Sequence, residues 1–128
     1  MSSKRLYGIR GAVSVENTEE SITKNVEEMC RLIFHENKIS SDDLVSIFFT
    51  MTDDLNALNA CTALRRGNCG IDVSKCALFA AKEPQMLNSL PMMVRVLVTA
   101  YMEDGSTVKP VYLGEAAKLR PDFASQKK

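Results

Sequence analysis

Two arginines lie inside segments that are otherwise apolar and typical of strands. Arg10 interrupts residues 8–12, and Arg95 interrupts residues 92–98. A guanidinium keeps its charge, so it must face water, pair with a carboxylate or line a pocket for an anion. Alternation along the strand allows Arg95 to face water, and Glu83, at the end of another apolar segment, is a candidate salt-bridge partner. The residues alone leave open a solvated arginine, a structural ion pair and an anion pocket.

The chain offers few of the groups that covalent or metal-assisted catalysis uses. It has no G-x-S-x-G nucleophile motif, no P-loop and no glycine-rich dinucleotide motif after a strand. Its single histidine, His35, and its four cysteines form no Cys-His pair at useful spacing and no C-x-x-C motif. Paired carboxylates occur only where helix caps or solvated faces are expected. The residues alone therefore point to no nucleophile, metal site or cofactor site.

The length and composition predict one soluble domain of 128 residues, of which 45% are apolar and 25% are charged. Basic and acidic residues number 16 each, which argues against a nucleic-acid or membrane-surface partner. No apolar stretch of about 18 residues predicts a membrane span, and the first residues lack the apolar core of a signal peptide. We expect a cytoplasmic protein with reduced cysteines, a single domain over residues 1–128 and a flexible tail at 123–128.

Hydrophobic patterning predicts strands at residues 6–15, 44–50, 76–81, 92–101 and 108–113. The run at 44–50 is nearly continuous, which predicts a fully buried strand. One helix is expected from a cap at Asn17 to about Asn37, a second from caps at Asp53 and Asp54 to about Arg65, and a helical turn at 85–90. This order predicts an α+β fold, a mixed β-sheet with two helices packed on one face. The other face then needs a cover, and the simplest is another subunit.

Short stretches spread over residues 8 to 123 together carry a family pattern. They are GIRGA at 8–12, VE at 15–16, TDDLNA at 52–57, ALR at 63–65, Glu83, VRV at 94–96, VYL at 111–113 and LRPD at 119–122. In this order, with twelve residues from Glu83 to Arg95, the chain resembles the small, monofunctional, trimeric chorismate mutases of the Bacillus type. The ordered set is specific, although no single stretch is.

The resemblance implies the rearrangement of chorismate to prephenate, a pericyclic shift within one molecule on the route to aromatic amino acids. Such a reaction needs no nucleophile, metal or cofactor. It needs a dicarboxylate held in a compact geometry and a fixed cation beside the ether oxygen, where negative charge develops. Members of this family are homotrimers that form a pseudo-α/β-barrel, with one site in each cleft between subunits.

The resemblance also implies a role for each matching residue. Arg95 is expected to be the central catalyst, at the ether oxygen and one carboxylate. Arg10 and Tyr112 are expected to bind the enolpyruvyl carboxylate. Glu83 is expected to accept a hydrogen bond from the ring hydroxyl, near the positive charge that develops on the ring. Without the resemblance, Tyr112 is most typical of a core or an interface.

Further substrate-binding positions are implied around these four. They are Arg65 and Arg120, expected from the neighbouring subunit, and Ala80, Asn59, Thr62 and Leu113. A familiar member of the family has phenylalanine, lysine and cysteine where Asn59, Thr62 and Ala80 align. Losing an apolar wall, a cation and a thiol predicts altered substrate affinity more than lost chemistry.

Two other functions are alternatives. Imine deaminases have a similar trimeric fold and also use an arginine in a cleft between subunits, but they do not require the whole set of Arg10, Glu83, Arg95 and Tyr112. A non-catalytic carboxylate-binding or regulatory module would bind the ligand without turnover, and the departures at Asn59, Thr62 and Ala80 motivate it.

Overall fold

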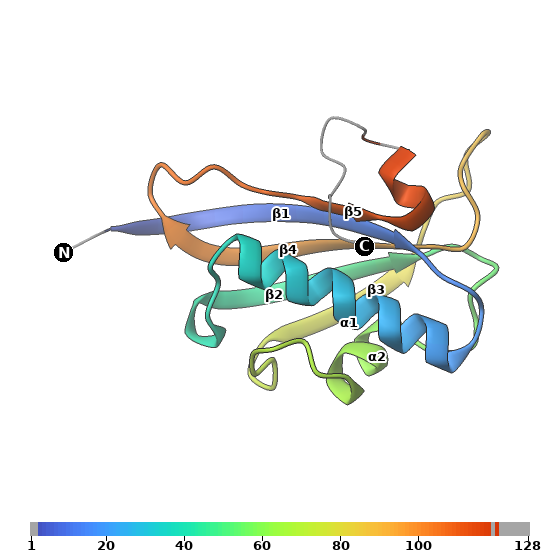
Figure 1. The fold of residues 1–128 in the computed structure, drawn as a ribbon, viewed down its shortest axis with the longest axis horizontal. Coiled ribbons are helices and arrows are strands. Elements are labelled where there is room, and N and C mark those ends of the chain that lie inside the picture. The colour runs from blue at the N-terminus through green and yellow to red at the C-terminus, as the bar shows by residue number, and fades with distance from the viewer. Residues whose placement is uncertain (1–2, 119, 121–128) are drawn as a thin grey trace.

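The computed structural model describes residues 3–118 and 120, so the predicted flexible tail at 123–128 lies outside the described residues. Five strands form one sheet (Figure 1). They are β1 (Lys4–Ser14), β2 (Leu44–Met51), β3 (Ala77–Lys82), β4 (Met93–Glu103) and β5 (Val111–Leu113). The helices are α1 (Glu19–Glu36), α2 (Ala60–Arg66) and two short 3₁₀ turns, η1 (Ser41–Asp43) and η2 (Gly114–Lys118). The order of strands and α-helices matches the prediction.

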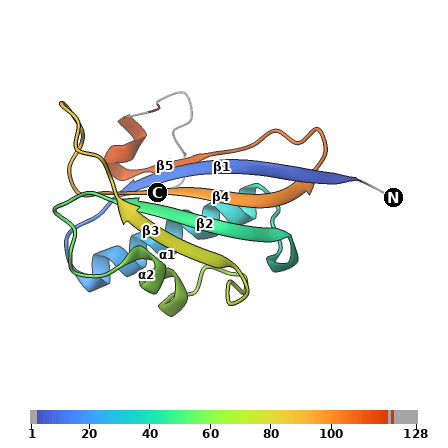
Figure 2. The same ribbon diagram turned by 180° about the vertical axis from the view of Figure 1, so that it is seen from behind.

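The sheet is mixed and its strands run in the order β3-β2-β4-β1-β5. The central strand β4 is antiparallel to β1 and β2, whereas β3 and β5 join as parallel edge strands. Both α-helices lie on one face, which we call the covered face, and Figure 2 shows the opposite, open face in front of them. The predicted α+β class is confirmed. No helix among the described residues is long and apolar enough to cross a membrane.

Side chains of α1 fill the space between that helix and the sheet. The helix repeats apolar residues at Ile22, Val26, Met29 and Ile33, and all four are fully buried. Gly11 on β1 allows this close approach, because a Cβ there would lie 3.0 Å from the Ile33 side chain and 3.1 Å from a backbone oxygen of β5. The pairing of β1 with β4 runs without a bulge, so this glycine is explained by packing alone.

The first helix is capped one residue later than predicted. Thr18 is the N-cap, and its hydroxyl accepts the Ser21 N–H at 3.0 Å. Asn17 plays a different part, because its Oδ1 accepts the N–H groups of Asn56 and Ala57, at 3.0 and 2.9 Å. The asparagine therefore ties the start of α1 to the segment before α2.

The second helix is much shorter than predicted, because residues 53–59 do not join it. Asn59 is its cap, with Oδ1 accepting the Cys61 N–H at 2.7 Å. The predicted caps have other partners: Asp53 pairs with Lys82 at 3.0 Å, and Asp54 accepts the Met92 N–H at 3.1 Å.

Three other predictions need correction. Residues 85–90 form no helix, and contain one turn in which the Ser89 N–H donates to the Met86 carbonyl at 3.2 Å. The strand β2 is not buried throughout, since Phe49 is buried whereas Phe48 is 39% exposed on the open face. The last strand begins only at Val111, because the backbone of Lys109 bonds at both ends to the side chain of Asn37, and residue 110 is a proline without an N–H.

Candidate active site

A single row of residues crosses all five strands on the open face. From one edge of the sheet to the other, direct partners follow the order Ala81, Thr50, Arg95, Ala12 and Tyr112. Partners opposite each other in a sheet project from the same face. Pairing of the strands therefore places Arg95 at the centre of the row, between β2 and β1.

Arg95 and Glu83 form the direct contact of the candidate site. The guanidinium Nε lies 3.7 Å from Glu83 Oε2, and the two side chains are 49% and 19% exposed. Glu83 follows β3, and its N–H donates to the Met51 carbonyl at 2.8 Å, which continues the pairing with β2 past the end of β3. Glu83 was a candidate partner of Arg95 on sequence alone, and the structure places the two together.

Arg10 and Tyr112 share this face without touching the pair. Arg10 is exposed and lies opposite Leu97, two residues along β4 from Arg95. Tyr112 lies two strands from Arg95 and is 6% exposed, in a small cluster with Ala12 and residues 93 and 116. Strand pairing thus brings the four predicted catalytic residues to one face, with two of them in contact.

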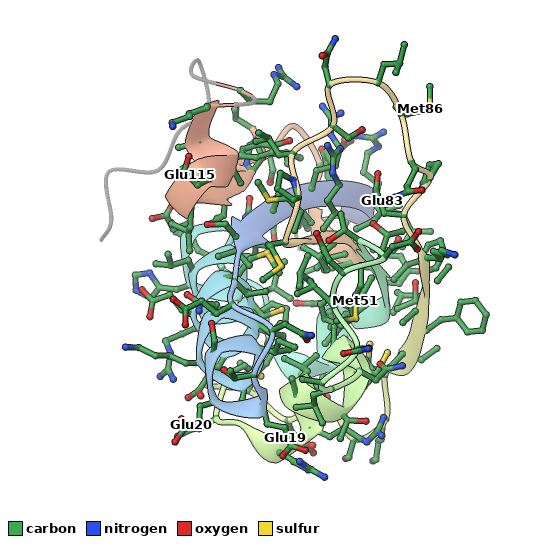
Figure 3. All side chains as sticks on the ribbon, turned by 90° about the vertical axis from the view of Figure 1, so that its right-hand side faces the viewer. Glu19, Glu20, Met51, Glu83, Met86 and Glu115 are labelled. Carbon is green, nitrogen blue, oxygen red and sulfur yellow. The ribbon has the colours of Figure 1, made fainter. Side chains whose placement is uncertain are left out.

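A pocket of about 600 Å³ opens beside Glu83. Its walls are residues 52–54, which follow β2, and residues 83–87 and 89–91 in the connection between β3 and β4. Figure 3 views the end of the sheet at which β1 and β2 finish, and shows Glu83 and Met86 at this connection, away from Glu19 and Glu20 of α1. Sequence patterns did not reveal this wall, because they predicted a helical turn there.

A second group of predicted residues lies elsewhere, around α2. Asn59, Thr62 and Arg65 belong to this helix and its cap, and Arg65 donates to the Thr62 hydroxyl at 3.4 Å. Ala80 is paired with the buried Phe49 and therefore projects from the covered face. A pocket of about 440 Å³ joins Ala80 and Asn59. Within one chain, Asn59, Thr62 and Arg65 are thus grouped on α2 and its cap, whereas Arg95 lies on β4.

Two further predicted positions complete the set. Leu113 pairs with Val13 and is buried in the main core, so its side chain supports the fold and does not reach the open face. Arg120 is half-buried just beyond η2.

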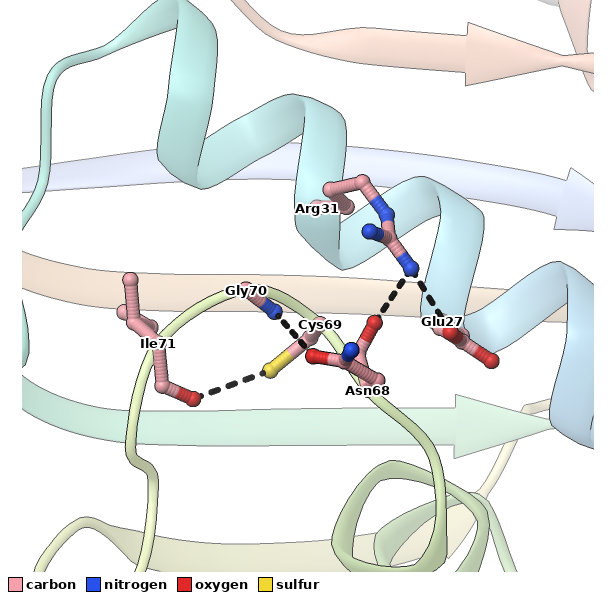
Figure 4. Close-up of polar contacts among 6 residues, drawn as sticks. All are labelled: Glu27, Arg31, Asn68, Cys69, Gly70 and Ile71. Atoms are coloured by element: carbon pink, nitrogen blue, oxygen red, sulfur yellow. Dashed lines mark hydrogen bonds and ion pairs between the residues drawn. The ribbon is translucent and has the colours of Figure 1, made fainter.

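A loop that follows α2 is tied to α1 (Figure 4). Arg31 donates to Glu27 at 2.6 Å and also to the backbone carbonyl of Asn68. The Asn68 side chain accepts the Gly70 N–H at 3.1 Å. These bonds hold the loop against α1 immediately after the last turn of α2.

The cysteine thiols fit a structural role better than a nucleophilic one. All four are free, and Cys30, Cys61 and Cys69 are buried. Burial raises the pKa of Cys30 and Cys61, and raises the pKa of Cys76 to about 11. Since the thiolate is the reactive form, these three thiols are poor nucleophiles at neutral pH.

Thr50 is a neighbour of the site that sequence patterns did not reveal. Its hydroxyl donates to Glu83 Oε1, and it is the direct partner of Arg95 across β2 and β4. The available signal was a hydroxyl residue that ends a run of apolar residues in β2. Nothing in the sequence indicated which carboxylate it would meet, because that contact joins residues 33 positions apart.

Three comparisons with known proteins agree: one with a family model, one with related sequences and one with a solved structure. The family model for chorismate mutase type I matches residues 6–123. Chorismate mutases of Thermus thermophilus and Bacillus subtilis are 36% and 30% identical, over 92% and 95% of this chain and 96% and 95% of theirs. A solved chorismate mutase from Clostridium thermocellum superposes with a TM-score of 0.77 at 30% identity, covering 88% of this chain and 98% of that one. The chain therefore belongs to the type I chorismate mutase family.

Proposed function

We propose that this chain rearranges chorismate to prephenate, with Arg95 as its principal catalytic group. The observation that carries the proposal is the Arg95–Glu83 ion pair on the open face of the sheet, on which Arg10 and Tyr112 also lie. The family membership gives the reaction, and the related proteins favour neither the imine deaminase nor the non-catalytic module.

The reaction is an exchange of bonds within one molecule. The ether C–O bond breaks while a C–C bond forms between the enolpyruvyl methylene carbon and the ring, so no proton or electron enters or leaves. When C–O cleavage runs ahead, negative charge builds on the ether oxygen and positive charge on the ring. A guanidinium already fixed beside that oxygen stabilises the transition state more than the substrate, and thus accelerates the step.

The position of Arg95 suits this catalytic role better than it suits stability. An ion pair at 3.7 Å with a half-exposed arginine contributes only about 0–1 kcal/mol to folding. The guanidinium keeps donors that Glu83 does not occupy, and they are available to a carboxylate and an ether oxygen. Glu83, on the other side, offers a carboxylate to the ring hydroxyl and to the developing positive charge.

Arg10 and Tyr112 would bind the enolpyruvyl carboxylate. Both lie on the open face with Arg95, and neither side chain has a hydrogen bond or ion pair to another described residue. An arginine and a phenol together can bind one carboxylate with several hydrogen bonds. Such binding holds the flexible side chain of the substrate in the compact geometry that the reaction needs.

We further propose that the working form is a homotrimer with sites between subunits. The open face exposes large apolar side chains without a cover, at Leu6, Phe48, Phe79, Leu97 and Tyr101. The two groups of site residues also lie on separate parts of one chain. A cyclic assembly would bring Arg65 and Arg120 of one subunit to Arg95 of the next. We place the reaction in the cytoplasm, where free cysteines stay reduced.

The first experiment follows chorismate and prephenate by NMR with pure protein. Arg95→Ala should lower kcat by at least about 10²–10³-fold, as expected when a preorganised donor to a developing oxyanion is removed. Arg95→Lys is the matched control, because it keeps the charge but loses the planar fork. A near-normal kcat in Arg95→Ala would contradict the role of Arg95, and inactive wild-type protein would contradict the function.

The second experiment tests whether sites are shared between subunits. Arg95→Ala and Arg65→Ala chains are unfolded together, mixed in equal amounts and refolded. Random assembly gives about a quarter of the sites an intact Arg95 from one chain and an intact Arg65 from the other. Activity should therefore return to about a quarter of the wild-type value. If Arg65→Ala is inactive and the mixture stays inactive as well, both groups act within one chain.

A further inference from the structure

The Glu83 carboxylate is held by more than its arginine. Its Oε2 lies 3.7 Å from Arg95 Nε, which is longer than the ~2.7–2.9 Å of a charge-assisted hydrogen bond. Its Oε1 accepts the Thr50 hydroxyl, and its backbone N–H donates to Met51, the residue after Thr50. The end of β2 therefore holds both the backbone and the side chain of Glu83.

Strand pairing gives Thr50 a fixed place between the two charged residues. It is the direct partner of Arg95 on β4 and of Ala81 on β3, and Glu83 lies two residues after Ala81. A threonine on a strand has a restricted χ1 angle, so its hydroxyl is a rigid donor. A glutamate has three rotatable side-chain bonds, and a half-exposed arginine cannot fix all of them.

We propose that Thr50 is a positioning residue for catalysis, which binds Glu83 Oε1 so that Oε2 stays directed at Arg95 and the substrate. This inference rests on the proposed function, since it assigns Thr50 to the same site. Thr50 acts through Glu83 and does not itself touch the reacting atoms. The hydroxyl thus selects one orientation of the carboxylate before substrate binds, which removes an ordering step from the reaction.

The test compares Thr50→Val, Thr50→Ser and Thr99→Val. Valine keeps the shape and strand preference of threonine and removes only the donor. Thr99 lies on the same open face, opposite Ser46 and without a hydrogen bond to Glu83, so Thr99→Val controls for loss of a hydroxyl on this face. Circular dichroism and thermal unfolding confirm that each variant is folded.

Thr50→Val should lower kcat about tenfold, as expected for the loss of a hydrogen bond to a charged group. The loss should fall mainly on kcat, because Glu83 faces positive charge that develops in the transition state. Thr50→Ser should recover most of the activity, and Thr99→Val should match the wild type. The inference would be overturned if Thr50→Val had the same kcat as Thr99→Val. It would also be overturned if kcat fell as far in Thr50→Ser as in Thr50→Val.

A double-mutant cycle tests whether Thr50 works through Glu83. In a chain that already carries Glu83→Ala, adding Thr50→Val should not lower kcat/KM further. It should also not raise the dissociation constant of a bicyclic dicarboxylate that resembles the transition state. An equal loss in both backgrounds would show that Thr50 acts by another route. If wild-type protein is inactive, the proposed function itself fails; if wild type and Arg95→Ala behave as proposed while Thr50 is neutral, only this inference fails.

Discussion

The two faces of the sheet have different chemistry although they share every strand. On the covered face, side chains such as Phe49, Val96 and Ile9 are buried against the helices. On the open face, their neighbours along the same strands are Phe48, Leu97 and Arg10, which are exposed. Strand alternation makes each pair adjacent in sequence and opposite in direction. The covered face accounts for folding, whereas the open face carries both the charges of the site and apolar area without a cover.

This difference explains why an arginine can stand in the central strand. Val94 and Val96 project into the core, and Arg95 between them projects to the open face. The neighbours of Arg95 in its row are a threonine and an alanine, which are both smaller than an arginine. The fold therefore supports the guanidinium rigidly without burying it.

The largest expected difference between the two faces is in stability, when two adjacent phenylalanines, one on each face, are replaced. Phe49→Ala removes a fully buried ring and should lower the free energy of unfolding by about 3–5 kcal/mol. Phe48→Ala removes a ring that is 39% exposed and packs on Phe79 at a centroid distance of 5.6 Å. It should leave the fold intact and weaken assembly, because it removes area from the proposed interface between subunits. Urea unfolding and sedimentation velocity measure the two effects.

Phe48→Leu is the control for the open face, since leucine keeps most of the apolar area. It should sediment like the wild type and retain activity at low protein concentration. Equal unfolding losses for Phe48→Ala and Phe49→Ala, with unchanged sedimentation, would show that the open face is no interface.

A smaller expected effect is a loss of folding stability at alkaline pH, which is caused by the partly buried thiol of Cys76. Burial raises the pKa of Cys76 from 9.0 to about 11, so between these pH values the folded chain holds a proton that the unfolded chain has lost. Stability is therefore complete below pH 9 and declines as the pH rises toward 11. For Cys76 the decline is on the order of 1 kcal/mol, because its thiol is partly exposed and solvent screens part of the shift.

Urea unfolding under reducing conditions, at intervals across that pH range, measures the decline. Cys76→Ser removes the titrating thiol, and its stability should fall less steeply than that of the wild type. The same slope in both proteins would mean that Cys76 does not cause the alkaline loss, and the other buried thiols, Cys30 and Cys61, would be tested next.

Local patterns in the sequence predicted much of the fold. Apolar spacing predicted α1 and its buried face. Arg95 was unusual from sequence alone because it lies inside an apolar strand. The row that joins Arg95 to Tyr112 follows from register, which depends on partners far apart in the chain. Local patterns could therefore identify these residues, but only the family resemblance joined them in one site.

The errors have a common physical cause, which is competition for polar groups across the fold. Asn17 and Asp54 both have the chemistry of helix caps, yet each bonds to backbone of a distant segment. Thr50 was missed for the same reason, because its partner Glu83 lies beyond the end of a different strand, 33 residues away. Propensity describes what a side chain can do locally, and tertiary contacts decide which option is used.

The smallest expected effect concerns Asn59, for which sequence and structure indicate different roles. The resemblance places it among substrate-binding residues, whereas its Oδ1 caps α2 by accepting the Cys61 N–H at 2.7 Å. Asn59→Ala should destabilise the protein by about 1 kcal/mol, and Asn59→Ser should preserve stability because serine is an equally good cap. Thermal unfolding measures that difference. KM then decides the role: Asn59→Ser with unchanged KM assigns Asn59 to positioning α2, whereas a raised KM at unchanged stability means that its amide binds substrate directly.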